Sequence, residues 1–323
     1  MFKIRSPYLN DFAKLEELFK ESSSLQELCN LHSLKKLSFC SQGIIPSRFR
    51  FIPSLHLAVE DKKILGFVVL QALSQPNNCW QINEVFVTNE MRNKGIGEEL
   101  VRYVLSVYGS QGIEYFIVEV DSLNLPAISL FHHCGFRRYA KIFFYEKEIN
   151  TSAEMPFTSI LNDKDFTIRP QNTSDLAELE KIDLSSIPAD LRPALGKSQK
   201  YFKENKNSIV LINKPRNLLI GWIHFEKTSD ENYFAELLML PGWTHLYENF
   251  LGTLIADLIA AQCNKFKLTV KVFDYITELN ELLIKHGFLP SQVKELLART
   301  VLQKVKEKKT AQAKIGVPRA APT

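Results

Sequence analysis

A stretch of six residues, RNKGIG at positions 92–97, places two cations and two glycines between an apolar run and an amphipathic pattern. Glycine adopts backbone angles that are closed to other residues, and it lets a ligand approach the main chain. A helix that begins at such a site presents unpaired N–H groups and the positive end of its dipole, which bind phosphate oxygens. The stretch therefore fits a pyrophosphate cradle. The alternative is a plain strand-to-helix turn with solvated cations, because short glycine motifs are frequent.

The same spacing excludes two other phosphate-binding loops. The GK[ST] ending of a Walker loop is absent, and so are the third spaced glycine and the downstream acid of a dinucleotide fingerprint. A cradle here would have to be of another kind.

The elements around the cradle alternate between strand and helix patterns. A strand, a helix and a strand in direct succession at the centre indicate an α/β or α+β fold with a mixed sheet flanked by helices. The predicted strands are 57–59, 64–70, 80–87, 115–120 and 142–148, and the predicted helices are 97–108 and 127–134.

The chain repeats itself once. FKIRSPYLNDFAKLEEL from Phe2 matches FTIRPQNTSDLAELEKI from Phe166 at an offset of 164 residues. ILGFVVL (64–70) then matches LIGWIHF (219–225) at an offset of 155, and FHHCGF matches LIKHGF at an offset of 152. A falling offset is typical of two diverged copies of one fold with a few deletions. We therefore predict a first copy at 1–148, a linker at 149–164, a second copy at 165–303 and a basic, disordered tail at 304–323.

Composition narrows the class of protein. The 323 residues are 45% hydrophobic and 24% charged, as in a globular protein, and no apolar run is long enough to cross a bilayer. Five scattered cysteines without a CxxC pair predict reduced thiols in the cytoplasm and no zinc site. The net charge is only +4, and the segment from Val301 onward holds six cations against one acid, so no basic face for nucleic acid is expected.

Two neighbouring motifs resemble one enzyme family. VFVTNEMRNKGIGEELVRYVL is similar to the acetyl-CoA signature of the GNAT N-acetyltransferases, an apolar strand followed by R/Q-x-x-G-x-G/A and a helix. FIVEVDSLNLPAISLFHHCGF is similar to the family's next motif, in the form seen in the ribosomal-protein N-terminal alanine acetyltransferases. The resemblance implies two tandem GNAT-like domains, each with a splayed central sheet.

The same resemblance implies the chemistry. A primary amine, on a protein, a peptide or a small molecule, would attack acetyl-CoA directly without a metal. A carboxylate would act as general base. Glu119 matches that role and Glu84 is a second candidate, although a strand carboxylate can also simply face solvent. The residues expected to bind acetyl-CoA are Val85, Phe86, Val87, Arg92, Asn93, Lys94, Gly95, Ile96, Gly97, Asn124 and Phe131. Asn124 also fits a helix N-cap.

The sequence departs from the family at one position. Phe131 stands where the family has the tyrosine that protonates the leaving thiolate. Another hydroxyl could substitute, with Tyr145 as the tentative acid, or water could act, or the activity could be lost. The alternative function is accordingly a non-catalytic, regulatory protein that binds acetyl-CoA.

The second copy lacks the cradle motif. AELLMLPGWTHLYENF (235–250) occupies its place, with Trp243, His245 and Tyr247 in the loop, and Lys271 stands at the position of Glu119. We therefore expect this copy to be catalytically silent, in a chain that is a monomer or a homodimer. Its aromatic residues are expected in the core rather than in an acceptor pocket.

Overall fold

The computed structural model describes residues 2–21, 54–74, 79–150, 164–229, 231–261 and 265–301. Most of the predicted linker and the whole predicted tail lie outside the described residues.

The first copy has the predicted order of elements. A 3-10 turn at Asn89–Met91 (η3) lies between its fourth strand and its central helix. The elements are β1 (Lys3–Arg5), α1 (Phe12–Glu21), β2 (Ser54–Glu60), β3 (Lys63–Ser74), β4 (Cys79–Val87), α3 (Ile96–Ser110), β5 (Tyr115–Asp121), α4 (Leu125–His133) and β6 (Arg137–Asn150).

The second copy repeats these elements in the same order, which confirms the internal repeat, and it has two short helices between its first helix and its second strand, where the first copy lies outside the described residues. Its elements are β7 (Phe166–Pro170), α5 (Leu176–Ser186), α6 (Arg192–Leu195), α7 (Gln199–Glu204), β8 (Ser208–Asn213), β9 (Leu218–Ser229), β10 (Asn232–Met239), α8 (Tyr247–Ala261), β11 (Lys265–Phe273), α9 (Thr277–Lys285) and β12 (Leu289–Thr300).

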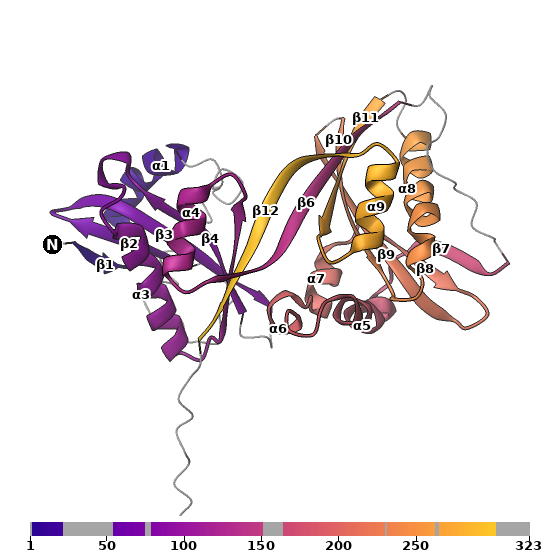
Figure 1. Cartoon of the computed structure of the whole chain (residues 1–323), viewed down its shortest axis with the longest axis horizontal. Helices are drawn as coiled ribbons and strands as arrows, with labels where there is room; N and C mark the ends of the chain where they lie inside the picture. The colour runs from indigo at the N-terminus through magenta and orange to yellow at the C-terminus, as the bar shows by residue number, and fades with distance from the viewer. Residues whose placement is uncertain are drawn as a thin grey trace, which may run out of the picture.

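Both copies share a single sheet of twelve strands, in the order β1-β2-β3-β4-β5-β12-β6-β11-β10-β9-β8-β7. The last strand of each copy has crossed into the other. Strand β12 lies between β5 and β6, and β6 in turn pairs with β11. Figure 1 shows β6 and β12 side by side at the centre of the molecule, with one copy on either side. This exchange was not part of the sequence prediction.

Helices cover both faces of each half of the sheet. In the first copy, α3 and α4 pack over one face around Phe116, Val118 and Phe136, while Leu15 of α1 packs on the other face with Phe67. In the second copy α8 and α9 correspond to α3 and α4, and α5–α7 lie on the opposite side, near the centre of the molecule (Figure 1). The mixed, helix-flanked sheet confirms the predicted fold class.

One ion pair recurs at the offset of the repeat. The Arg5 guanidinium contacts both carboxylate oxygens of Asp11, at 2.6 and 3.1 Å. Arg169 contacts both oxygens of Asp175 in the same way, at 2.7 and 2.8 Å. In each copy the pair joins the first strand to the turn before the first helix, so its retention follows from a shared local fold.

Three expectations from the composition concern membrane-spanning helices, metal-binding clusters and cysteine thiols. Among the described residues no helix is both long and apolar enough to cross a membrane, and no cluster of three His, Cys, Asp or Glu could hold a metal. Cys79 and Cys134, the two cysteines that the structure describes, are free and buried. Burial raises the pKa of the Cys79 thiol to about 12, which keeps it protonated.

Candidate functional site

Strands β4 and β5 lie side by side only at their beginnings. Their parallel pairing covers Cys79–Gln81 against Tyr115–Ile117 and goes no further, whereas on its other edge β5 pairs with β12 from Tyr115 to Asp121. Within β4 the register against β3 shifts between Ile82 and Glu84, so that Asn83 is the extra residue of a β-bulge. Bulges re-aim side chains and are frequent beside active sites.

The bulge brings both candidate bases to one face of the sheet. Without an extra residue, positions 81 and 84 would point to opposite faces, because strand side chains alternate. With Asn83 inserted, Glu84 lies opposite Val69, which faces α1, and Gln81 faces the same way. Gln81 and Glu119 line a common cavity on that face. The local register therefore groups Glu84 and Glu119 on the α1 side.

The N-terminus of α3 has the geometry of the predicted cradle. Gly95 is the N-cap, with φ of +79°, and apart from its own atoms and its chain neighbours the described residues place no atom within 4 Å of where its Cβ would be. Asn93 also has a positive φ, of 59°. The first hydrogen bond of the helix runs from the Glu99 N–H to the Gly95 carbonyl, so the preceding amides point out of the helix end. A ligand could approach this backbone closely.

The second glycine of the motif has a different role in the fold. A Cβ on Gly97 would lie 2.6 Å from Cδ1 of Leu130 on α4. Gly97 thus lets α3 and α4 pack together. The two cations are exposed, with Arg92 Nε 3.4 Å from the Val87 carbonyl and Lys94 Nζ 3.5 Å from the Met91 sulfur.

The other predicted site residues are spread more widely. Asn124 is the N-cap of α4 and accepts the Ala127 N–H at 3.2 Å, which confirms the capping interpretation. Phe131 is buried against Phe136 in the first copy's core. Tyr145 on β6 is buried in the second copy's core, where burial raises its pKa, and it is not among the residues that line the cavity with Glu119.

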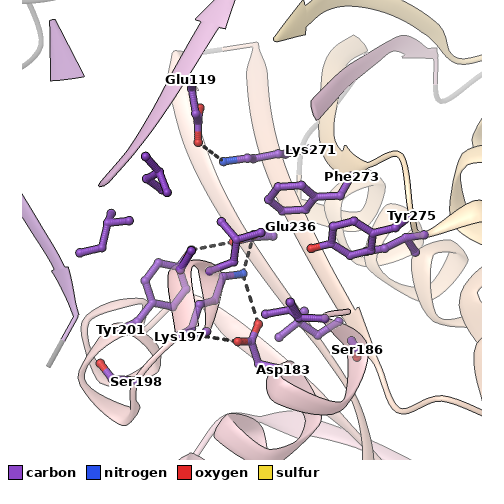
Figure 2. A pocket seen from close by; sticks show the side chains of 18 of the residues that line it. Glu119, Asp183, Ser186, Lys197, Ser198, Tyr201, Glu236, Lys271, Phe273 and Tyr275 are labelled. Atoms are coloured by element: carbon purple, nitrogen blue, oxygen red, sulfur yellow. Dashed lines mark hydrogen bonds and ion pairs between the residues drawn. The ribbon is translucent and has the colours of Figure 1, made fainter. Parts of the chain in front are cut away.

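A cavity of about 190 Å³ lies between the two copies. The first copy contributes Leu73, Gln81, Ile117 and Glu119. The second copy contributes the larger part, from α5, the segment 194–201, β10, β11 and the residues that follow β11. Most of the walls are apolar, and the polar groups are concentrated at a few points (Figure 2).

One cluster of polar side chains in the cavity is centred on Glu236 of β10. Its Oε1 lies 2.6 Å from Lys197 Nζ, and its Oε2 accepts the Tyr201 hydroxyl at 2.6 Å. The Lys197 backbone N–H donates to Asp183 Oδ2 at 2.7 Å. Figure 2 shows Lys197 lying between Glu236 and Asp183. Buried charges need such partners to offset their lost hydration.

The pKa values of Asp183 and Glu236 are shifted in opposite directions. Burial raises the pKa of Asp183 to about 6, against the opposing effect of Lys197. Burial alone would also raise the pKa of Glu236, but Lys197, Lys271 and the Tyr201 hydroxyl outweigh it and hold that pKa at about 2. Glu236 is therefore ionised at neutral pH, while Asp183 can exchange a proton near it.

A second polar group joins the two copies. Lys271 of β11 lies with Nζ 3.4 Å from Glu119 Oε1, and Figure 2 shows the two side chains pointing toward each other. Burial lowers the pKa of Lys271, but Glu119 and Glu236 raise it by more, so the ammonium stays charged. Lys294 of β12 lies 4.0 Å from the other oxygen of Glu119.

The loop that replaces the cradle in the second copy is filled by aromatic side chains. Trp243 stacks on His245 with ring centroids 6.1 Å apart, and Tyr247 is buried as the first residue of α8. Trp222 is fully buried and donates from its indole to Gln171 at 2.6 Å. Trp222 and Tyr247 are core residues, as expected.

Sequence reasoning missed most of the polar residues of the cavity. Asp183, Lys197, Tyr201 and Glu236 lie in the copy that was expected to be silent. For Glu236 a signal was present, because the strand pairing gives Glu84 and Glu236 the same position in the two copies, opposite Val69 and His224. The offset between them is again 152 residues.

Comparison with known proteins finds similarity to acetyltransferases in the first copy. Residues 15–136 match the model of the Acetyltransferase (GNAT) family. N-acetyltransferase 8 of Homo sapiens is 30% identical over 91 residues, which make up 27% of this chain and 40% of that protein. The chain thus spans well under half of the length of this relative.

Several solved structures cover nearly the whole chain, including the following two. A tandem GNAT protein from the clavulanic acid biosynthesis pathway superposes with a TM-score of 0.60 at 11% identity, over 94% of this chain and all of that one. A GCN5-related N-acetyltransferase from Sphaerobacter thermophilus gives a TM-score of 0.56 at 12% identity, over 94% and 97% of the two chains. The chain therefore has the fold of tandem GNAT proteins, and residues 15–136 carry the sequence pattern of the GNAT acetyltransferase family.

Proposed function

We propose that the chain is an acetyl-CoA-dependent N-acetyltransferase in which the first copy binds acetyl-CoA and transfers its acetyl group to a primary amine. The acceptor would be a protein or peptide N-terminus or a small-molecule amine. The second copy would not bind acetyl-CoA, since Trp243 and Tyr247 fill the place of the cradle.

One observation carries this proposal. Strands β4 and β5 separate after Gln81 and Ile117, and from there β5 leads Glu119 to the cavity wall while β4 leads to the open N-terminus of α3 at Gly95. The separation of β4 from β5 therefore leaves the Glu119 carboxylate near the end of one strand and the anion-binding N-terminus of α3 at the end of the other. The backbone of Val85–Val87 pairs with β3 on one side and has no β5 partner on the other. That free edge suits an extended arm of the co-substrate.

The chemistry needs one proton acceptor and one proton source. Glu119 would take a proton from the amine, directly or through water, because an ammonium has no lone pair. The amine nitrogen then forms an amide bond to the acetyl carbon, the carbon–sulfur bond breaks, and the sulfur leaves with the electron pair and gains a proton. Glu84 is the second candidate base.

The cradle would consist of the amides of residues 93–97 with Arg92 and Lys94, and Asn124 would lie beside it at the start of α4.

The proton for the sulfur would come from water. Phe131 has no proton to give and lies in the core, and Tyr145 is in the core of the other copy. Water would then serve, as a thiolate is a moderate base. The same two residues support the alternative of a non-catalytic acetyl-CoA-binding protein, which would bind acetyl-CoA without turnover of any amine.

Calorimetry with acetyl-CoA tests the proposed site. One site per chain is expected, weakened at least tenfold in the double variant Arg92→Ala/Lys94→Ala, because two phosphate-directed cations are removed. The matched control is Lys181→Ala/Lys285→Ala, which removes two exposed cations from the second copy. No binding to the intact chain, or equal weakening in both double variants, would overturn the proposal.

Two accompanying proposals concern the organisation of the chain. We propose the boundaries 1–148 and 165–303 for the copies, as sequence units that share one sheet. We also propose a cytoplasmic location, which the free, buried thiols of Cys79 and Cys134 support.

A further inference from the structure

The cavity between the copies is the feature that the proposed function leaves without a role. Glu119, the proposed base, lies in its wall, but most of the other wall residues belong to the second copy. Among them, Leu195 ends α6, Leu237 and Leu238 lie on β10, and Tyr275 follows β11. A molecule in contact with Glu119 in this cavity would therefore touch the second copy on most of its surface.

The volume of the cavity limits the size of such a molecule. An apolar protein cavity of roughly 150 Å³ holds benzene. The 190 Å³ measured here therefore suits a compact body of about six to ten non-hydrogen atoms. The walls suit an apolar body, because half of the lining residues are leucine, isoleucine or aromatic.

The charged groups around the cavity limit which charge a bound molecule can carry. Three carboxyls, Glu119, Asp183 and Glu236, face two ammonium groups, Lys197 and Lys271. Lys294 of β12, outside the lining, lies 4.0 Å from Glu119, so the charges of the six groups balance when all are ionised. The contacts of Glu119, at 3.4 and 4.0 Å, are longer than the 2.6 Å between Lys197 and Glu236, so Glu119 is the carboxylate that an incoming ammonium can contact most readily.

We infer that the second copy builds the acceptor pocket of the first, and that the acceptor is a primary monoamine with a compact apolar body. This inference rests on the proposed function, since the amine must meet Glu119. The ammonium lies near Glu119 in place of part of the Glu119–Lys271 contact, and the apolar body lies against Leu195, Leu238 and Phe273. The second copy is then a specificity element rather than an unused duplicate.

The test uses 2-phenylethylamine as the probe and the full chain throughout. Leu195→Trp narrows the pocket from the second copy, at a half-buried position that can accept a larger side chain. It should raise the Kd of the amine by calorimetry, and the KM of the amine in the transfer assay, at least tenfold. Acetyl-CoA binding should stay unchanged. Leu73→Trp narrows the same cavity from the first copy and should act alike.

The matched control is Ile284→Trp, on an exposed position of α9 outside the cavity, which should leave every value unchanged. Spermidine and a short peptide with a free N-terminus are the comparison acceptors. If Leu195→Trp and Leu73→Trp both leave amine binding and turnover unchanged, the cavity is not the acceptor pocket. If only the peptide or spermidine is acetylated, the proposed substrate class is wrong.

Failure of the proposed function has a different signature. A chain that binds acetyl-CoA but transfers it to no acceptor fails as an enzyme, while direct calorimetry of 2-phenylethylamine still tests the pocket. Absence of binding by this amine in wild type, with folded protein confirmed by its thermal unfolding, contradicts the inference whatever acetyl-CoA does.

Discussion

The Glu119 carboxylate and the Lys271 ammonium lie 3.4 Å apart, although the two residues hold the same position in the two copies. Their strands, β5 and β11, are separated in the sheet by β12 and β6, so the side chains meet across the cavity. Both side chains are about one-fifth exposed, which leaves water access to the pair. The divergence of the second copy from carboxylate to ammonium thus supplies a counter-charge to the proposed base of the first.

Glu119→Gln should lower kcat for amine acetylation by roughly 100-fold to 10,000-fold, the usual contribution of a positioned general base. The amide keeps the size of the side chain but cannot accept the proton. Steady-state kinetics with a thiol-detecting assay would measure this, with acetyl-CoA affinity expected to be unchanged. Glu114→Gln, at an exposed position just before β5, is the control. A variant with wild-type kcat would remove Glu119 from the chemistry and leave Glu84 as the base.

Gly97→Ala should destabilise the protein through a clash rather than through the cradle. Its new Cβ would meet Cδ1 of Leu130 at 2.6 Å, so α3 or the leucine must shift. Leu130→Ala removes that atom. In a double-mutant cycle of unfolding free energies, the cost of Gly97→Ala should therefore fall by about 1 kcal/mol or more when residue 130 is alanine. Additive costs would show that the contact does not limit the packing of α3 on α4.

Local sequence patterns predicted the elements of the fold but not how the copies join. The strands and helices of the first copy lie where the periodicity put them, because each depends on its own alternation of apolar residues and on nearby glycines. The insertion of β12 between β5 and β6 depends on pairs such as Leu296 with Glu119, which are far apart in sequence. Both β6 and β12 have the alternation of apolar residues that a neighbour of β5 needs. Periodicity alone therefore cannot tell which of the two strands pairs with β5.

The site was predictable to the extent that it follows a motif. The backbone of Gly95 and the position of Glu119 follow directly from the strand–loop–helix pattern. The roles of Asp183, Lys197 and Tyr201 do not, since they depend on the way α5–α7 approach β5 across the cavity. The packing of Gly97 against Leu130 was not predictable either, because a glycine in a sequence does not tell which neighbour requires it.

Asp183→Asn should change how stability depends on pH. Burial raises the pKa of Asp183 from 3.8 to about 6 in the folded chain. A carboxyl with a raised folded-state pKa favours folding when protonated. Its ionisation therefore costs stability above pH 6, by about 3 kcal/mol, and this cost vanishes as the pH falls below about 4. The variant should gain Tm relative to wild type between pH 4 and pH 7.

Differential scanning calorimetry at both pH values would measure that gain. Asp190→Asn, at an exposed position shortly after α5, is the control and should leave the difference in Tm the same at both pH values. Parallel pH profiles for wild type and Asp183→Asn would contradict the prediction, and would mean that Lys197 offsets the burial of this carboxyl fully.

A chain that ends at Phe288 should lose the fold of the first copy as well as the end of the second. The deletion removes β12, and with it the hydrogen-bonded neighbour of β5 on one side and of β6 on the other. It also removes Leu297, which is fully buried in the core that holds Phe116 and Val118 of the first copy. Burial of one leucine is worth about 1.5–3 kcal/mol, and the lost strand pairing adds to that.

Thermal unfolding followed by circular dichroism, with limited proteolysis of the first copy, would measure the effect of this deletion. A chain that ends at Val301 keeps every described strand and is the control, expected to unfold as the full chain does. If the copies were independent domains, the chain ending at Phe288 would keep a protease-resistant first copy with acetyl-CoA affinity intact. The strand exchange predicts the opposite, that cleavage appears in both copies together and that acetyl-CoA binding is lost. The reason is that β5 lies between β12 and β4, the strand that leads to the cradle, and loses its partner on one edge.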